Sequence, residues 1–205
     1  MKISEVKKNI TKYTKMLEKI RKEEIKQNNK KFNSLAPPAK RVALAKDVIL
    51  QIKAKRFTVK HGVWLELDND YFSDYGREYR NISIKEEFNK NKEITCNGCA
   101  VGSLMLSATL FNNKTTAKDL YDEDFFNNIR RGEKMPNGLN TIFSREQLIK
   151  IELAFEGGTG GFTAEYTSSD DYAKCINFYN RYAIAENRLI AIMNNIIKNK
   201  GEFKP

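Results

Sequence analysis

Two cysteines, Cys96 and Cys99, enclose the dipeptide Asn97-Gly98 directly before an apolar run. The run, residues 99–111, predicts a helix with Cys99 at its N-terminus. The positive end of a helix dipole stabilises a thiolate, so Cys99 could be a low-pKa nucleophile or a redox thiol. The simpler interpretation is structural, because Asn-Gly favours a tight turn and buried cysteines pack as small apolar residues. We therefore expect a tight corner that seats the 99–111 helix in the core.

A cysteine nucleophile needs a general base, and His61 is the only histidine in the chain. Any catalytic dyad is therefore Cys99 with His61, or, as a second choice, Cys96 with His61. Redox chemistry of the thioredoxin type is disfavoured, because the C-x-x-C pair lacks the strand–helix–strand context of that fold and no proline precedes a credible downstream strand. The enzyme hypothesis thus reduces to Cys99 and His61.

The same residues raise the question of a metal site. Three cysteines and one histidine would complete a tetrahedral zinc set, consisting of Cys96, Cys99, Cys175 and His61. Only the first two have the short spacing of zinc ligands, and Cys175 lies on the apolar seam of a predicted helix. The sequence therefore predicts no metal and no other cofactor.

The net charge of +10 is concentrated at the front of the chain, where residues 1–60 contain 18 Lys and Arg against 5 Asp and Glu. This imbalance indicates a nucleic acid or an acidic protein as partner; a solvated Lys-rich helix is the alternative. Lysines at helical spacing could follow a phosphate backbone, namely Lys8, Lys12, Lys15, Lys19, Lys22 and Lys26. No base-stacking platform or known DNA-binding motif accompanies them, so nucleic-acid binding would be non-specific.

The basic segment also carries a heptad pattern. Apolar residues recur at alternating spacings of three and four, at Ile3, Val6, Ile10, Tyr13, Leu17 and Ile20. They predict an amphipathic helix over residues 2–27, which pairs with another long helix or forms a homo-oligomer through residues 3–20. The polar residues 27–34 predict a linker. The expected domains are therefore 1–34, a basic heptad helix with linker, and 35–205, one globular helix-rich domain.

The globular part begins with a helix that Pro37-Pro38 opens and that extends to about residue 55. Alternating apolar residues over 57–67 then predict a short β-hairpin or a bulged strand around His61-Gly62. The following loop is rich in aromatic residues, of which Tyr71, Phe72 and Tyr75 are candidate exposed contacts.

Serine capping boxes predict the starts of three further helices, after Ser83, Ser144 and Ser168. The helix after Ser168 is expected to continue unbroken to about residue 199. The predicted fold class is α+β, predominantly α-helical, with long amphipathic helices at the N- and C-terminal ends. No apolar run reaches membrane-spanning length, the N-terminus lacks a signal peptide, and three cysteines form no disulfide framework. We therefore expect a cytosolic protein without membrane contact.

Four segments together resemble a family of small proteins encoded by tailed bacteriophages and mobile elements. They are Leu44-Ala-Lys-Asp-Val48, Cys96-Asn-Gly-Cys-Ala-Val-Gly102, Ile151-Glu-Leu-Ala-Phe-Glu156 and Arg188-Leu-Ile-Ala-Ile-Met-Asn-Asn-Ile-Ile197. The resemblance covers residues 40–205. It implies a phage product located in the bacterial host cytoplasm or in the virion, and it supplies no catalytic residues.

These observations predict a non-catalytic phage accessory protein that binds a host or viral macromolecule, a protein or nucleic acid, through its basic N-terminal helix. A virion component that assembles through the heptads is the first alternative. An enzyme that uses Cys99 with His61 is the second.

Overall fold

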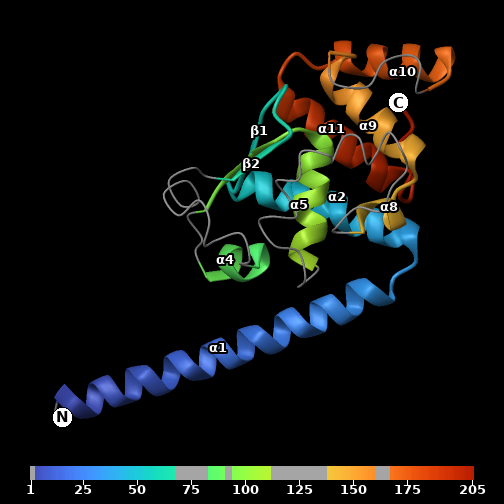
Figure 1. The fold of residues 1–205 in the computed structure, drawn as a ribbon. Helices are drawn as coiled ribbons and strands as arrows, with labels where there is room; N and C mark the ends of the chain where they lie inside the picture. The colour runs from blue at the N-terminus through green and yellow to red at the C-terminus, as the bar shows by residue number, and fades with distance from the viewer. Residues whose placement is uncertain (1–2, 68–82, 91–93, 112–137, 160–166) are drawn as a thin grey trace. The chain divides into compact units, whose positions relative to one another are not determined.

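The computed structural model of the protein describes residues 3–67, 83–90, 94–111, 138–159 and 167–205 (Figure 1). Contacts divide the chain into two compact units, Met1–Leu35 and Ala36–Pro205. The described residues are mainly helical with one three-stranded sheet, which confirms a predominantly α-helical α+β fold. Within those ranges, no helix is both long enough and apolar enough to cross a membrane.

The first unit is a single helix, α1 (Ile3–Ser34). It continues through residues 27–34, so the prediction of a linker there was wrong. That segment is polar but contains neither glycine nor proline, and polarity alone does not end a helix. The helix stops only next to Pro37-Pro38, where Ala36 is extended with ψ 155°. A residue before proline is disfavoured in the helical region, which accounts for the observed end.

The second unit is built around α5 (Ala100–Phe111), which confirms the helix predicted over 99–111. Every residue from Ala100 to Thr109 is buried, as expected for a helix that is apolar on all sides. Among the described helices, four contact it: α2 (Pro37–Lys53), α4 (Ile84–Lys90), α8 (Leu139–Ile142) and α9 (Arg145–Glu156). Figure 1 shows α5 surrounded by these elements.

The sheet differs from the predicted hairpin. Its strands are β1 (Phe57–Val59), β2 (Leu65–Leu67) and β3 (Cys96–Gly98), in the order β1-β3-β2. The central strand β3 is parallel to β1 and antiparallel to β2. Because β3 lies between them, β1 and β2 are separated by about 10 Å, twice the distance between neighbouring strands. The two-residue turn of a hairpin does not span this distance. The five residues from Lys60 to Trp64 span that gap, and the hairpin prediction was therefore wrong.

The Cys96–Cys99 segment also differs from its prediction. Cys96, Asn97 and Gly98 form the central strand and pair on both sides, so Asn97-Gly98 is not the tight turn that we expected. Cys99 alone connects this strand to α5. Sequence patterns missed the strand because three residues are too short to show a period of two.

The predicted C-terminal helix is two helices, α10 (Ser169–Asn180) and α11 (Ala185–Lys198). The break falls at residues 181–184, just before the interruption of the apolar seam at Glu186. Glu186 lies in the first turn of α11, where an acidic side chain favours the helix dipole. The prediction of one long C-terminal helix was therefore wrong. α10 packs on α9, and α11 packs on α2 and α9.

The three capping predictions are confirmed. Each serine hydroxyl accepts a bond from the backbone N–H three residues later: Ser83 from Glu86, Ser144 from Gln147 and Ser168 from Asp171. The short helix α8 (Leu139–Ile142) precedes Ser144. Arg41 of α2 donates to the carbonyls of Ile142 and Gly201, which ties both α8 and the C-terminal segment to α2.

Candidate functional site

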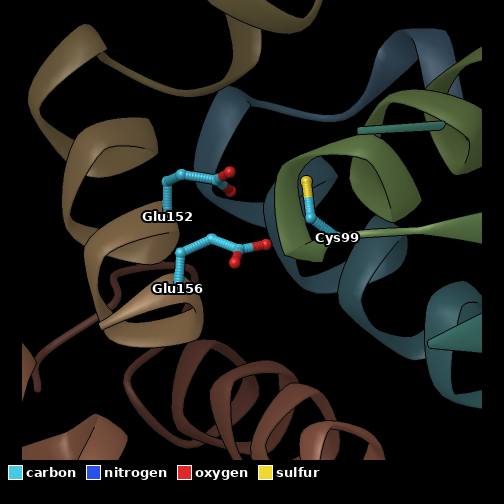
Figure 2. Close-up of side chains that lie close together, drawn as sticks. All are labelled: Cys99, Glu152 and Glu156. Carbon is cyan, nitrogen blue, oxygen red and sulfur yellow. The ribbon is translucent and has the colours of Figure 1, made fainter. Parts of the chain in front are cut away.

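The chemically distinctive feature of the second unit is a buried cluster of one thiol and two carboxyl groups. Cys99, Glu152 and Glu156 each offer one ligand atom, and these atoms all lie within 4.8 Å of one another. Figure 2 shows both glutamates extending from α9 toward Cys99 at the start of α5. A spacing of four residues puts Glu152 and Glu156 on one face of α9. The cluster therefore forms where the N-terminus of α5 meets the last turns of α9.

Two contacts hold the start of α5 in place. The Cys99 N–H donates to the Trp64 carbonyl at 3.2 Å, and the Gly102 N–H donates to the Cys99 Sγ at 3.4 Å. Cys99 thus occupies the N-cap position of α5, where a side-chain acceptor satisfies one of the free N–H groups of the first turn. Its sulfur is directed to the inside of the second unit, and Cys99 is fully buried.

Glu156 is held by the turn that follows β1. The Gly62 N–H donates to both carboxylate oxygens of Glu156 at 3.0 Å, and the His61 Nε2 lies 3.0 Å from its Oε2. The same His61 nitrogen lies 3.2 Å from the Glu156 carbonyl oxygen and 3.4 Å from the Thr159 hydroxyl. The His61 side chain is 40% exposed, whereas that of Glu156 is 3% exposed. His61 therefore forms the rim of the cluster, and Glu156 lies inside it.

Glu152 is buried, but its carboxyl group is not fully hydrogen-bonded. The Cys99 thiol and the Val101 N–H lie beside its carboxyl group and lower its pKa, against the larger effect of burial. Its Oε2, however, is buried and makes no hydrogen bond. A buried polar atom without a partner costs about 1–3 kcal/mol, and more if the group is charged. This oxygen is the least satisfied part of the cluster.

The environment disfavours negative charge on all three groups. Burial, followed by the neighbouring Glu156, raises the pKa of the Glu152 carboxyl to about 8. Burial and then Glu152 raise the pKa of the Cys99 thiol well above its ordinary value. Burial also raises the pKa of Glu156, although the Gly62 N–H, His61 and Arg188 act in the opposite direction. Desolvation and like-charge repulsion thus act together.

These shifts bear on the predicted Cys99–His61 dyad. The structure does bring both residues to one carboxyl group, since Glu156 contacts His61 and belongs to the Cys99 cluster. However, the helix dipole was expected to lower the pKa of Cys99, and the opposite is found. Burial and the two glutamates raise this pKa, which is the direction that disfavours the thiolate form of a nucleophile.

The set Cys96, Cys99, Cys175 and His61 does not come together. Cys96 lies on β3, and Cys175 lies on α10, where its thiol is directed to the Lys150 carbonyl at 3.5 Å. Burial raises the pKa of Cys175 to about 12, as expected for a cysteine used as an apolar residue. Within the described ranges, Cys99, Glu152 and Glu156 are the only group of three or more potential metal ligands.

Sequence reasoning missed Glu152 and Glu156, although a signal was present. The apolar residues of α9 cover almost its whole circumference, at Leu148, Ile149, Ile151, Leu153, Ala154 and Phe155. On a helical wheel Glu152 lies between Leu148, Ile149 and Phe155, in the middle of the apolar surface. A carboxyl group at such a position is buried, and buried carboxyl groups require a partner.

The predicted contact residues of the N-terminal segment lie on α1. Five of the six lysines are exposed: Lys12, Lys15, Lys19, Lys22 and Lys26. Lys8 lies on the same helix, but the structure does not describe its side chain. Four residues of the heptad seam are also exposed: Ile10 (60%), Tyr13 (67%), Leu17 (66%) and Ile20 (45%). The predicted aromatic contacts Tyr71, Phe72 and Tyr75 lie outside the described residues.

The two sets of α1 residues lie on opposite faces. With Ile3 at heptad position a, the seam occupies a and d, and the six lysines alternate between f and c. Positions c and f form the outer surface of a coiled coil, so the seam can pair without covering the lysines.

Comparison with family models, curated proteins and solved structures finds no match to this chain.

Proposed function

We propose that the protein is a non-catalytic phage accessory protein that pairs with a second copy through the α1 seam and binds nucleic acid through the lysines opposite it. The phage context, in the bacterial cytoplasm or in a virion, rests on the sequence resemblance alone. The observation that carries the proposal is the pair of opposed faces on α1. Large apolar residues exposed in a heptad pattern favour a helical partner with the same pattern.

The second copy is the favoured occupant of the seam for two reasons. The described residues of the unit Met1–Leu35, from Ile3 on, contain no secondary structure besides α1, and an isolated helix gains most of its stability from packing an apolar face. The flanking positions are also compatible with self-pairing, because Arg21 lies at e and Glu23 at g, the positions at which coiled coils form interhelical ion pairs.

Pairing is tested by the mass in solution. Full-length protein is expected to elute with a mass of at least twice the 23.7 kDa of the chain in size-exclusion chromatography with light scattering. Leu17→Glu places a charge in the seam and is expected to give the monomer mass at micromolar concentration. Lys19→Glu, on the outer face, is the matched control and should leave the mass unchanged. If the wild-type protein has the mass of a monomer, the hypothesis of self-pairing is wrong. If it forms assemblies larger than a dimer, the alternative function as a virion component is favoured.

Nucleic-acid binding is tested by its salt dependence. Replacing Lys15, Lys19 and Lys22 by glutamine is expected to weaken binding to duplex DNA of any sequence and to lower the slope of log affinity against log salt by up to about 3 per chain. Binding is measured by fluorescence anisotropy between 50 and 200 mM salt.

The matched control for the lysines removes the same charge from the second unit, at the exposed residues Lys46, Lys53 and Lys198. If both triple variants lose affinity equally, net charge and not the α1 surface causes binding. If wild-type protein does not bind DNA at 50 mM salt, the partner is not nucleic acid, and an acidic protein takes its place.

A further inference from the structure

The Cys99–Glu152–Glu156 cluster is close to the geometry of a metal site. Zinc is bound by thiolate sulfur at 2.3 Å and by carboxylate oxygen at 2.0–2.2 Å, so tetrahedral ligands lie about 3.5 Å apart. The three ligand atoms lie within 4.8 Å of one another, and all three side chains end in rotatable groups. The ligand atoms would therefore have to approach one another by at most about 1.3 Å (4.8 Å less about 3.5 Å) to reach ligand spacing.

An independent observation points the same way. Glu152 is 2% exposed, lies inside the cluster and has an oxygen with no hydrogen-bond partner. Two carboxyl groups and a thiol meet there, and within the part of the chain that the structure describes no lysine or arginine side chain is hydrogen-bonded to any of them. A cation would supply the partner that Glu152 lacks, and it would convert like-charge repulsion into shared coordination.

We propose that Cys99 Sγ, Glu152 and Glu156 bind one divalent zinc ion and thereby join the N-terminus of α5 to the C-terminal turns of α9. The thiolate selects zinc over magnesium and calcium, which prefer sites made of oxygen atoms alone. Three protein ligands leave one coordination position for water. The site is separate from the α1 surface, so it stands or falls independently of the proposed function.

The charges balance around such an ion. A thiolate and two carboxylates with Zn²⁺ give a net charge of −1 once the thiol and carboxyl protons have left to solvent. Arg188 lies near this charge, since its guanidinium donates to the carbonyl of Phe155, next to Glu156, at 2.6 Å. Its charge acts on Glu156 directly. The excess negative charge thus has a buried counter-ion on α11.

His61 has a positioning role in this site. Its Nε2 contacts Glu156 Oε2, and it is not among the three groups whose ligand atoms lie together. Together with the Gly62 N–H it fixes the orientation of the Glu156 carboxylate, which is how a hydrogen-bonded outer group supports a ligand.

The proposal is tested with full-length protein that has been stripped with a chelator and then titrated with Zn²⁺ against a chromophoric competitor. Wild type is expected to bind one zinc per chain, and Mg²⁺ in large excess should not displace it. Cys99→Ser and Glu152→Gln should each weaken binding by about 100-fold or more, and His61→Ala by about 10–100-fold. Substitution with Co²⁺ should give the near-ultraviolet thiolate-to-cobalt absorption in wild type and not in Cys99→Ser.

Cys175→Ser is the matched control, because Cys175 is equally buried and lies outside the cluster. It should bind zinc as wild type does and keep the cobalt absorption. Near-ultraviolet circular dichroism of each metal-free variant establishes that it is folded; Glu152→Gln decides the question if Cys99→Ser does not fold. Absence of zinc binding by the wild type, or wild-type affinity in folded Glu152→Gln, overturns the proposal.

Discussion

Gly102→Ala is expected to destabilise the second unit by about 3 kcal/mol or more, although alanine is the better helix former by about 1 kcal/mol. A Cβ atom at position 102 would lie 1.9 Å from the Trp64 carbonyl oxygen and 3.0 Å from its carbonyl carbon. Both atoms belong to the backbone, so no side chain can move aside. The same carbonyl accepts the Cys99 N–H, and relief of the overlap would break that bond. Chemical denaturation followed by circular dichroism measures the loss.

Gly98→Ala is the control for this prediction, because it approaches the same carbonyl oxygen less closely. Its Cβ would lie 3.2 Å from the same Trp64 oxygen, a contact that a shift of a few tenths of an ångström relieves. We expect a loss of less than about 1 kcal/mol. Equal midpoints for Gly102→Ala and wild type would show that β2 and α5 are not held at the observed distance.

Arg188→Ala is expected to cost about 3–5 kcal/mol, because it leaves two backbone carbonyls without their donor, at about 1–3 kcal/mol each, and also removes the packing of the guanidinium. Arg188 is 4% exposed, and its guanidinium donates to Tyr182 O at 2.7 and 3.1 Å and to Phe155 O at 2.6 Å. It also lies 3.8 Å from the centre of the Tyr179 ring. Truncation leaves the last turn of α9 and the α10–α11 connection without their shared donor.

Two further variants make the Arg188 result specific. Arg188→Lys keeps the charge but cannot donate to both carbonyls in the planar geometry of a guanidinium, so it should recover less than half of the loss. Arg181→Ala removes an exposed arginine from the same connection and should change the free energy of unfolding by less than about 0.5 kcal/mol. An Arg188→Ala midpoint within 1 kcal/mol of wild type would contradict the assigned role.

Local chemistry made the helix starts predictable from the sequence. A serine followed three residues later by Glu, Gln or Asp specifies its own hydrogen bond, and the bonds of Ser83, Ser144 and Ser168 form as expected. The apolar run of α5 was also sufficient to predict a buried helix, because a helix that is apolar on all sides is buried on all sides. These features depend on a few neighbouring residues.

Features that depend on distant residues were not predictable in this way. The alternation over 57–67 correctly indicated strands, but the partner of both strands is Cys96–Gly98, which has no periodic signal of its own. The buried cluster likewise depends on the contact between α5 and α9. Cys99 was singled out from sequence, whereas Glu152 and Glu156 become its neighbours only when these helices pack.

The placement of β3 between β1 and β2 has a consequence for synthesis of the protein. Leu67 precedes Cys96 by 29 positions, so the first two strands leave the ribosome well before the strand that joins them. At about 5–20 residues per second, this delay lasts a few seconds, during which both strands keep unpaired edges. Closing so long a loop makes the sheet a late step of folding. A nascent chain arrested before residue 96 should therefore be protease-sensitive over residues 57–67, and a longer one should not.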